Sequence, residues 1–186
     1  MASVLEEMGA GVVDSDAMTH EELSKPEVVE TFRSWWGDRV CKADGGIDRA
    51  AMGEVIFADA SQRRRMEAYL YPRLERRRHG MMEAFNADPS VRAIVFNSPL
   101  LYEVGLDKVC DVVVFVECDR RTRVERVART RGWTERELDR REKLQKPLDM
   151  KRRKADHTVV NDADVDSLRS QIKPLYERLL TNHSSC

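Results

Sequence analysis

Two aspartates near the start of the chain are the first residues with the chemistry of a catalytic site. The stretch Gly11–Asp16 is predicted to be a short buried strand that ends in Asp14 and Asp16. A carboxylate at the end of a strand can accept the proton of a substrate hydroxyl during phosphoryl transfer, and this role suits Asp16. Asp16 also suits the N-cap of a helix predicted to start at Ala17. The sequence favours neither role, and the two are compatible.

A basic segment near the end of the chain is the second such feature. Arg140–His157 is dense in Arg and Lys, contains Pro147, and includes four consecutive cations, Lys151–Lys154. Such a run is often only the solvated face of a helix. It is also typical of a mobile lid whose cations close over a triphosphate and stabilise charge in the transition state.

Strands that alternate with helices must position these residues. Buried strands are predicted at Gly11–Asp16, Arg92–Phe96, Asp111–Val116 and Thr158–Val160, and the β-branched run Asp111–Val116 suggests cover on both faces. The alternation indicates an α/β fold with a parallel sheet and helices on both sides. In such a sheet the working residues follow the carboxyl ends of the strands. Helices are predicted at 2–8, 17–23, 26–36, after Asp48, at 61–85 with Pro72 interrupting or kinking it, after Asp119, from Thr134 and at 165–180.

Composition limits the class of protein. The 186 residues carry a net charge of −1, which argues against a nucleic-acid coat, and Arg63–Arg78 alternates with glutamates as a solvated helix does. No apolar run reaches the roughly 20 residues that span a membrane, and the N-terminus lacks the basic residues of a signal peptide. We therefore expect a cytoplasmic protein with no membrane or nucleic-acid partner, whose four scattered cysteines are reduced thiols.

Several segments, in order, resemble the dephospho-CoA kinase family. The paired aspartates, the DRAA helix, the PLL-x-E turn and the K-xxx-AD-xxxx-N tail form an ordered set that covers nearly the whole chain. The matching segments are Val12–Thr19, Gly45–Asp59, Tyr71–Leu74, Asn97–Asp107, Asp111–Gly132 and Gln145–Asn161.

The resemblance implies a reaction and a set of site residues. ATP would phosphorylate the ribose 3′-hydroxyl of dephospho-CoA, the last step of coenzyme A synthesis, with Mg²⁺ assisting and no protein side chain assigned to the metal. Asp16 would be the catalytic carboxylate. Tyr71 stands where the family usually has His, which departs from the family's acceptor contact. The substrate-binding residues would be Asp14, Arg49, Tyr71, Pro72, Leu100 and Leu101, and the ATP- and phosphate-binding residues Arg131, Arg141, Lys151 and Asn161.

The resemblance also implies an architecture. It is a three-layer α/β/α, P-loop kinase-like fold with a parallel sheet of order 2-3-1-4-5 and a helical lid. We expect residues 1–186 to form a single domain and a monomer, with an acceptor-binding helical region at about 20–90 and a lid segment at about 132–155.

One family motif is missing. Members begin with a strand and a loop of the form GxxxxGKS or GxxxxGKT, which cradles phosphates and helps to hold Mg²⁺. None of the 186 residues supplies it, so we expect an N-terminally truncated version of a complete kinase, through a misplaced start codon or a fragment. The strands Arg92–Phe96 and Asp111–Val116 would then have unpaired edges, and the chain would be a poor kinase. The alternatives are a non-catalytic nucleotide-binding remnant and a related kinase for another small-molecule acceptor.

Overall fold

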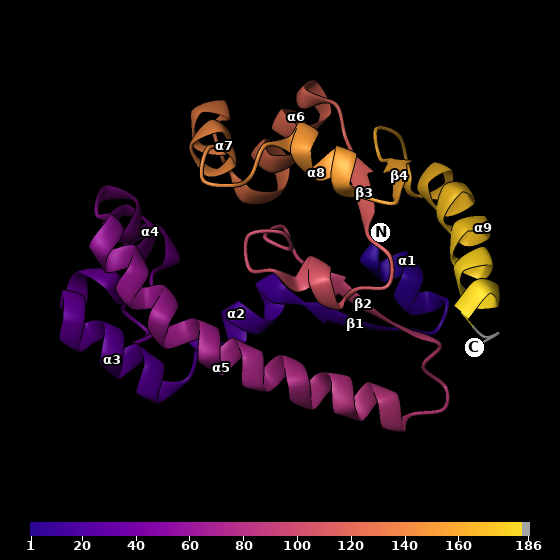
Figure 1. Cartoon of the computed structure of the whole chain (residues 1–186). Coiled ribbons are helices and arrows are strands. Elements are labelled where there is room, and N and C mark those ends of the chain that lie inside the picture. Colours follow the sequence, from indigo (N-terminus) through magenta and orange to yellow (C-terminus); the bar gives the residue numbers. More distant parts are fainter. Residues whose placement is uncertain (184–186) are drawn as a thin grey trace. The chain divides into compact units, whose positions relative to one another are not determined.

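The computed structural model describes residues 1–183, which divide into two compact units (Figure 1). Gly11–Asn97 forms one, here called the helical unit, and residues 1–10 together with the chain from Ser98 onward form the other, here called the lid unit. Each unit is described by itself, and the assignment of one single domain stays a prediction. The predicted acceptor-binding helices belong to the helical unit, and the predicted lid segment belongs to the lid unit.

The helical unit contains two strands and most of the predicted acceptor region. Helix α3 begins with Pro26 in its first turn, where the missing N–H costs nothing, and ends at Gly37, whose φ of 74° favours glycine. Asp48 and Asp59 cap the next two helices by accepting backbone N–H bonds. The elements are β1 (Ala10–Asp14), α2 (Ser15–Leu23), α3 (Pro26–Trp36), the 3₁₀ turn η1 (Asp38–Val40), α4 (Arg49–Ala58), α5 (Ala60–Ala87) and β2 (Ala93–Asn97).

Helix α5 is continuous through Pro72, so of the two predicted effects of this proline the interruption is wrong, while a kink stays a prediction. A proline inside a helix removes one backbone hydrogen bond and is usually disruptive. Here α2 and α4 both pack against α5 (Figure 1), and this tertiary packing outweighs the local penalty. The 28-residue helix α5 is therefore the element against which the shorter helices of the helical unit pack.

An aromatic and aliphatic core holds these helices together. Phe32 and Val28 of α3 are fully buried, and the rings of Phe32 and Trp36 lie 5.0 Å apart. The buried indole N–H of Trp36 donates a 2.7 Å hydrogen bond to Gln62 Oε1 on α5. Leu70 completes the contact from α5. The core explains why the short helices keep their position on the long one.

A buried carboxylate adds an electrostatic tie between α2 and α5. Glu22 is 1% exposed, and its carboxylate binds Arg73 Nε at 2.5 Å and Lys25 Nζ at 2.7 Å. Arg73 also binds Glu27 at 2.7 Å. Burial raises the pKa of Glu22, but the hydrogen bonds from Lys25 and Arg73 outweigh it and hold the pKa below its ordinary value. Glu22 is therefore charged and paired at neutral pH.

The lid unit joins the first helix to the second half of the chain. Helix α1 packs against α9, and Glu7 binds Arg169 at 2.6 Å. No helix within residues 1–183 is long and apolar enough to cross a membrane. The elements are α1 (Ala2–Glu7), the 3₁₀ turn η2 (Leu106–Val109), β3 (Val114–Glu117), α6 (Arg120–Arg131), α7 (Glu135–Glu142), α8 (Leu148–Lys154), β4 (His157–Val160) and α9 (Val165–His183).

The strands form two separate pairs. β1 pairs with β2, and β3 pairs with β4 in parallel, with Val114 opposite His157 and Glu117 opposite Val160. β2 belongs to the helical unit and β3 to the lid unit, and the expectation that their edges lack a strand between them stays a prediction. The expected cover on both faces of β3 is wrong, because its residues are only half-buried and Val116 is 38% exposed. Each of these apolar strands lies in a sheet of only two strands.

Three of the four cysteines lie in the described part of the chain, and their reduced state stays a prediction. Cys41, Cys110 and Cys118 are free thiols, and Cys186 lies outside the described residues. Burial raises the pKa of both the Cys110 and the Cys118 thiol. Neither thiol therefore has the thiolate character of a reactive cysteine.

Gly11 is predicted to be required by the packing of α5 on β1. A Cβ added at Gly11 would lie 2.6 Å from Cγ of Phe85, closer than real carbon atoms approach. We expect Gly11→Ala to lower the free energy of unfolding by about 1–3 kcal/mol through overpacking, as measured by urea denaturation.

Gly80 supplies the matched control, because a Cβ there meets nothing within 4 Å and the residue lies inside α5. Gly80→Ala should raise stability by about 0.5–1 kcal/mol through helix propensity. Equal stabilities of Gly11→Ala and the wild type would show that Phe85 moves aside without cost.

Candidate active site

Asp14 links three elements of the helical unit. Its Oδ1 accepts the backbone N–H of Ala17 at 2.8 Å, so it is the N-cap of α2. Its Oδ2 accepts a 2.6 Å hydrogen bond from Asn97 Nδ2 at the end of β2. Both oxygens of this carboxylate are therefore bonded within the protein. Its predicted contact with substrate stays a prediction, beside an evident structural role.

Asp16 lies in the first turn of α2 rather than at its cap. The helix begins at Ser15, and its N-cap is Asp14, so the interpretation of Asp16 as a helix cap is wrong. The Asp16 side chain is exposed, and the N-terminal end of a helix stabilises a negative charge there. Its assignment as the carboxylate that faces the acceptor hydroxyl stays a prediction, no longer in competition with a capping role.

The predicted acceptor residues fall in both units. Arg49 opens α4 with an exposed side chain, and Tyr71, 42% exposed, precedes the exposed Pro72 on α5. Leu100 and Leu101 are half-buried in the turn after β2, within the lid unit. That they line one pocket stays a prediction.

Lys151 forms a buried junction in the lid unit. Its ammonium donates to Pro99 O at 2.7 Å and to Gln145 Oε1 at 2.9 Å, and it lies 2.9 Å from Glu103 Oε1. An ammonium has three hydrogens, and each has an acceptor here. Lys151 is 7% exposed, unlike the exposed lid cation that its run of four basic residues suggested. Its contact with phosphate stays a prediction and would require it to give up one of these partners.

Glu103 and its neighbour extend this Lys151 junction (Pro99, Glu103, Gln145 and Lys151). The backbone N–H of Lys146 donates to Glu103 Oε1 at 2.7 Å, and the Lys146 ammonium donates to Tyr102 O at 2.7 Å. Burial raises the pKa of Glu103, but the hydrogen bonds from Lys151 and Lys146 outweigh it and hold the pKa below its ordinary value. The turn after β2 is thereby bound to the start of α8 by ionised groups.

Asn161 is held at the carboxyl end of the β3–β4 pair. Its backbone N–H donates to Glu117 O at 2.8 Å, and its carbonyl accepts a 2.6 Å bond from Arg126 Nη1. Arg126 also donates to Ala163 O at 2.9 Å. This backbone network fixes the position of Asn161 after β4, and the predicted adenine contact of its side chain stays a prediction.

The two predicted phosphate-binding arginines meet at one tryptophan. Arg131 ends α6 and Arg141 lies on α7, and their Cζ atoms lie 4.8 Å and 4.1 Å from the centre of the Trp133 ring. Arg141 Nε also donates a 2.7 Å bond to Glu137. Sequence reasoning missed Trp133, although its place between two helix-end signals, Gly132 and Thr134, was visible.

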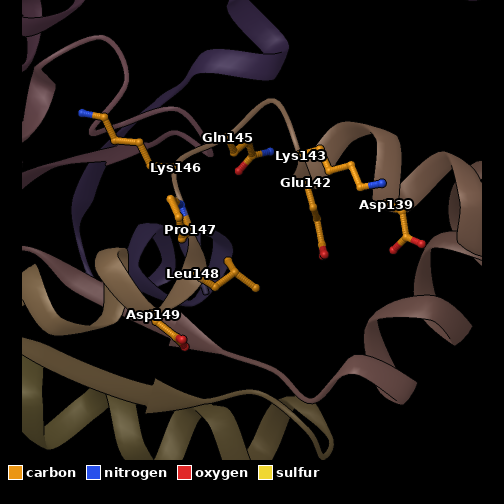
Figure 2. A pocket seen from close by; sticks show the side chains of 8 residues that line it. All are labelled: Asp139, Glu142, Lys143, Gln145, Lys146, Pro147, Leu148 and Asp149. Carbon is orange, nitrogen blue, oxygen red and sulfur yellow. The ribbon is translucent and has the colours of Figure 1, made fainter.

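A hollow of about 480 Å³ lies beside this part of the lid (Figure 2). Figure 2 shows the side chains of Glu142 and Leu148 projecting toward it, while the Lys146 side chain points away. Its lining mixes both signs of charge, so it is not by itself a phosphate site. The lining residues are Asp139, Glu142, Lys143, Gln145, Lys146, Pro147, Leu148 and Asp149.

The comparisons with known proteins agree on one family. A family model for dephospho-CoA kinase matches residues 1–167. The chain belongs to the dephospho-CoA kinase family. A dephospho-CoA kinase of Symbiobacterium thermophilum is 33% identical over 174 residues, which are 93% of this chain and 72% of the relative. One of Anaeromyxobacter dehalogenans is 37% identical over 171 residues, 90% and 79% of the two chains.

Solved structures support the P-loop kinase-like fold of this family. A crystal structure from Thermus thermophilus matches with a TM-score of 0.75 and 25% identity, over 96% of this chain and 89% of that one. The Campylobacter jejuni dephospho-CoA kinase matches in fold with a TM-score of 0.65 and 16% identity, over 97% and 90% of the two chains. The predicted family and fold class are therefore confirmed.

The Mg²⁺ that the resemblance implies would find few protein ligands among the described side chains. Within residues 1–183, no group of three or more His, Cys, Asp or Glu side chains could hold a metal ion. Mg²⁺ commonly binds through one or two carboxylates together with substrate phosphates and water. The described side chains therefore fit Mg²⁺ only as an ion that is held mainly by the phosphates of ATP.

Lys151→Met should destabilise the lid unit and change its response to pH. Removing one partner of a buried ion pair leaves the other uncompensated, so we expect a loss of about 3–5 kcal/mol in the free energy of unfolding at pH 7. In the wild type, the folded pKa of Glu103 is lowered, so its stabilisation is present above the unfolded pKa of about 4.3 and is lost as pH falls through the folded value. Without Lys151, burial should raise the pKa of Glu103. Acidification should then protonate Glu103 and reduce the destabilisation of the Lys151→Met variant.

The measurement is urea denaturation between pH 4 and pH 8. The difference between the wild type and Lys151→Met should narrow toward acid pH, and adding Glu103→Gln should recover part of the loss. Lys154→Met, at an exposed position of the same helix, should stay within about 0.5 kcal/mol of the wild type. A constant difference across this range would mean that Glu103 does not titrate against Lys151.

Proposed function

We propose that this chain is a dephospho-CoA kinase, which transfers the γ-phosphoryl group of ATP to the ribose 3′-hydroxyl of dephospho-CoA and so completes coenzyme A synthesis. Family membership and relatives that are named dephospho-CoA kinase over 90% or more of this chain support the proposal. The observation that carries it is Asp16, an exposed carboxylate in the first turn of α2 that the helix does not need as a cap.

The chemistry is assigned to the chain's own residues as follows. Asp16 orients the acceptor hydroxyl and takes its proton as the phosphoryl group is transferred. Asp14 keeps the start of α2 in place through Ala17 and Asn97, and so fixes the position of Asp16. Arg131 and Arg141 bind the phosphates of ATP and offset charge that develops in the transition state, and Asn161 contacts the adenine.

The remaining assignments concern the substrates. Mg²⁺ enters with ATP as its phosphate complex and shields the negative charge of the triphosphate. Both substrates are small soluble molecules, so we assign the kinase to the cytoplasm, acting as a monomer. The acceptor is contacted by Arg49, Tyr71, Pro72, Leu100 and Leu101, with Lys151 as a further candidate for the phosphates.

The missing phosphate-binding loop defines the first functional prediction. None of the 186 residues supplies the GxxxxGKS or GxxxxGKT pattern. Charge-assisted contacts to phosphate contribute about 1.5–3 kcal/mol each, and 1.36 kcal/mol is a tenfold change in rate. We expect a chain with a strand and such a loop joined ahead of Met1 to phosphorylate dephospho-CoA several orders of magnitude faster than the 186-residue chain.

The assay is ATP-dependent phosphorylation of dephospho-CoA, with thermal unfolding measured alongside. Both activity and stability should rise when the loop is joined. A 186-residue chain that is already fully active would show that another group handles the phosphates. Nucleotide binding without turnover in both chains would favour the non-catalytic alternative.

Asp16→Asn, made in the loop-joined chain, tests the catalytic carboxylate. Turnover should fall by about 10²–10⁴, the usual contribution of a general base, while the KM for ATP stays unchanged because this carboxylate does not bind ATP. Steady-state kinetics with both substrates measure the two effects. Undiminished activity of Asp16→Asn would show that the base is a different residue.

Asp14→Asn is the matched control at the neighbouring carboxylate. It should cost less turnover and more stability, about 1–2 kcal/mol, because the charge-assisted bond to Asn97 is lost. A larger loss of turnover in Asp16→Asn and a larger loss of stability in Asp14→Asn would show that Asp16 is catalytic and Asp14 structural.

A further inference from the structure

Trp133 lies between the C-cap residue of α6 and the N-cap residue of α7. Gly132 ends α6 with a φ of 66°, a conformation suited to glycine, and its N–H bonds to the carbonyl of Ala128. Thr134 begins α7, and its hydroxyl oxygen accepts the N–H of Glu137 at 3.2 Å. The backbone is therefore fixed on both sides of Trp133.

Ion pairs between α6 and α7 hold the two helices in one orientation. Arg120 of α6 binds Glu135 at 3.0 Å and Asp139 at 2.6 Å. Arg123 binds Glu142 at 3.2 Å. These contacts bring side chains of α7 back against the ring that follows α6.

Two arginines from different helices contact this ring. The Cζ of Arg131 lies 4.8 Å, and that of Arg141 4.1 Å, from the ring centroid, both inside the roughly 6 Å range of cation–π attraction. Glu137 binds Nε of Arg141 at 2.7 Å and so helps to orient its guanidinium. Two like charges near each other repel, and the negative face of the indole offsets this repulsion.

We propose that Trp133 is a positioning residue, which holds Arg131 and Arg141 together as a preformed pair for the triphosphate of a nucleotide. The proposal rests on the proposed function, which assigns these two arginines to phosphate. A guanidinium that contacts a ring through its face keeps its N–H edge for oxygen acceptors, so stacking and phosphate binding are compatible. Holding both groups before the ligand arrives lowers the entropic cost of binding.

A purely structural role for Trp133 makes a different demand on residue 133. To fill space between α6 and α7, the position needs only apolar bulk, which leucine supplies. To hold two guanidinium groups, it needs an aromatic face, which phenylalanine supplies more weakly and leucine lacks. The comparison of W133L with W133F therefore separates the two roles.

The experiment measures binding of ATP and of inorganic tripolyphosphate to the 186-residue chain by calorimetry, with thermal unfolding alongside. We expect W133L to weaken both ligands by about 5- to 30-fold with only a small fall in the unfolding temperature, and W133F to restore most of the affinity. R121L is the control, because Arg121 is an exposed arginine of α6 that pairs with Glu125 at 2.9 Å. R121L removes one positive charge from α6 without changing the Trp133 ring, and it should change affinity by about twofold or less.

Three results would overturn the proposal. The first is that W133L binds the ligands as tightly as the wild type does. The second is that W133L and W133F lose affinity equally and both unfold at a lower temperature. The third is that the wild type shows no measurable binding of tripolyphosphate. The proposed function fails differently. A wild-type chain that binds triphosphate with the expected dependence on residue 133, but whose loop-joined form does not phosphorylate dephospho-CoA, would remove the kinase assignment and leave the role of Trp133 intact.

Discussion

The buried ammonium of Lys151 constrains the lid unit more than any exposed ion pair does. Taking a charge out of water costs several kcal/mol, and the cost is offset only where the partners and hydrogen bonds are well placed. Here a carboxylate, a backbone carbonyl and a side-chain amide supply three acceptors at 2.7–2.9 Å. These acceptors come from both the turn after β2 and the segment before α8. The junction therefore holds these two segments and α8 together.

At the end of β1, one aspartate has the structural role of a helix cap and the other does not. A carboxylate with both oxygens bonded inside the protein, as in Asp14, is poorly suited to accept a proton from a substrate. Asp16 is two residues further on, in the first turn of the helix that Asp14 caps, with an exposed side chain. Of the two nearby aspartates, Asp14 thus holds the start of α2 in place, and Asp16 is the candidate base.

Local signals in the sequence predicted the helix ends well. Pro26 and Gly37 bound α3, and the caps at Asp48, Asp119 and Thr134 were all predicted, because capping depends on neighbouring residues alone. What depends on distant partners was missed or misread. Lys151 looks like the cations beside it, and only Glu103 and Pro99, about 50 residues away, make it a buried group. The path of α5 through Pro72 and the half-buried faces of β3 are likewise set by tertiary packing, which local pattern does not encode.

The arginines of the lid fall into two sets with different consequences. Arg120 and Arg123 are bound to acidic side chains of α7, so their charge is largely compensated and their effect is to orient the two helices. Exposed ion pairs contribute only about 0–1 kcal/mol each, so orientation rather than stability is what they supply. Arg131 and Arg141 share the ring of Trp133, and Arg141 also binds Glu137. Ion pairs therefore orient α6 and α7, and the ring of Trp133 brings one guanidinium from each helix close together.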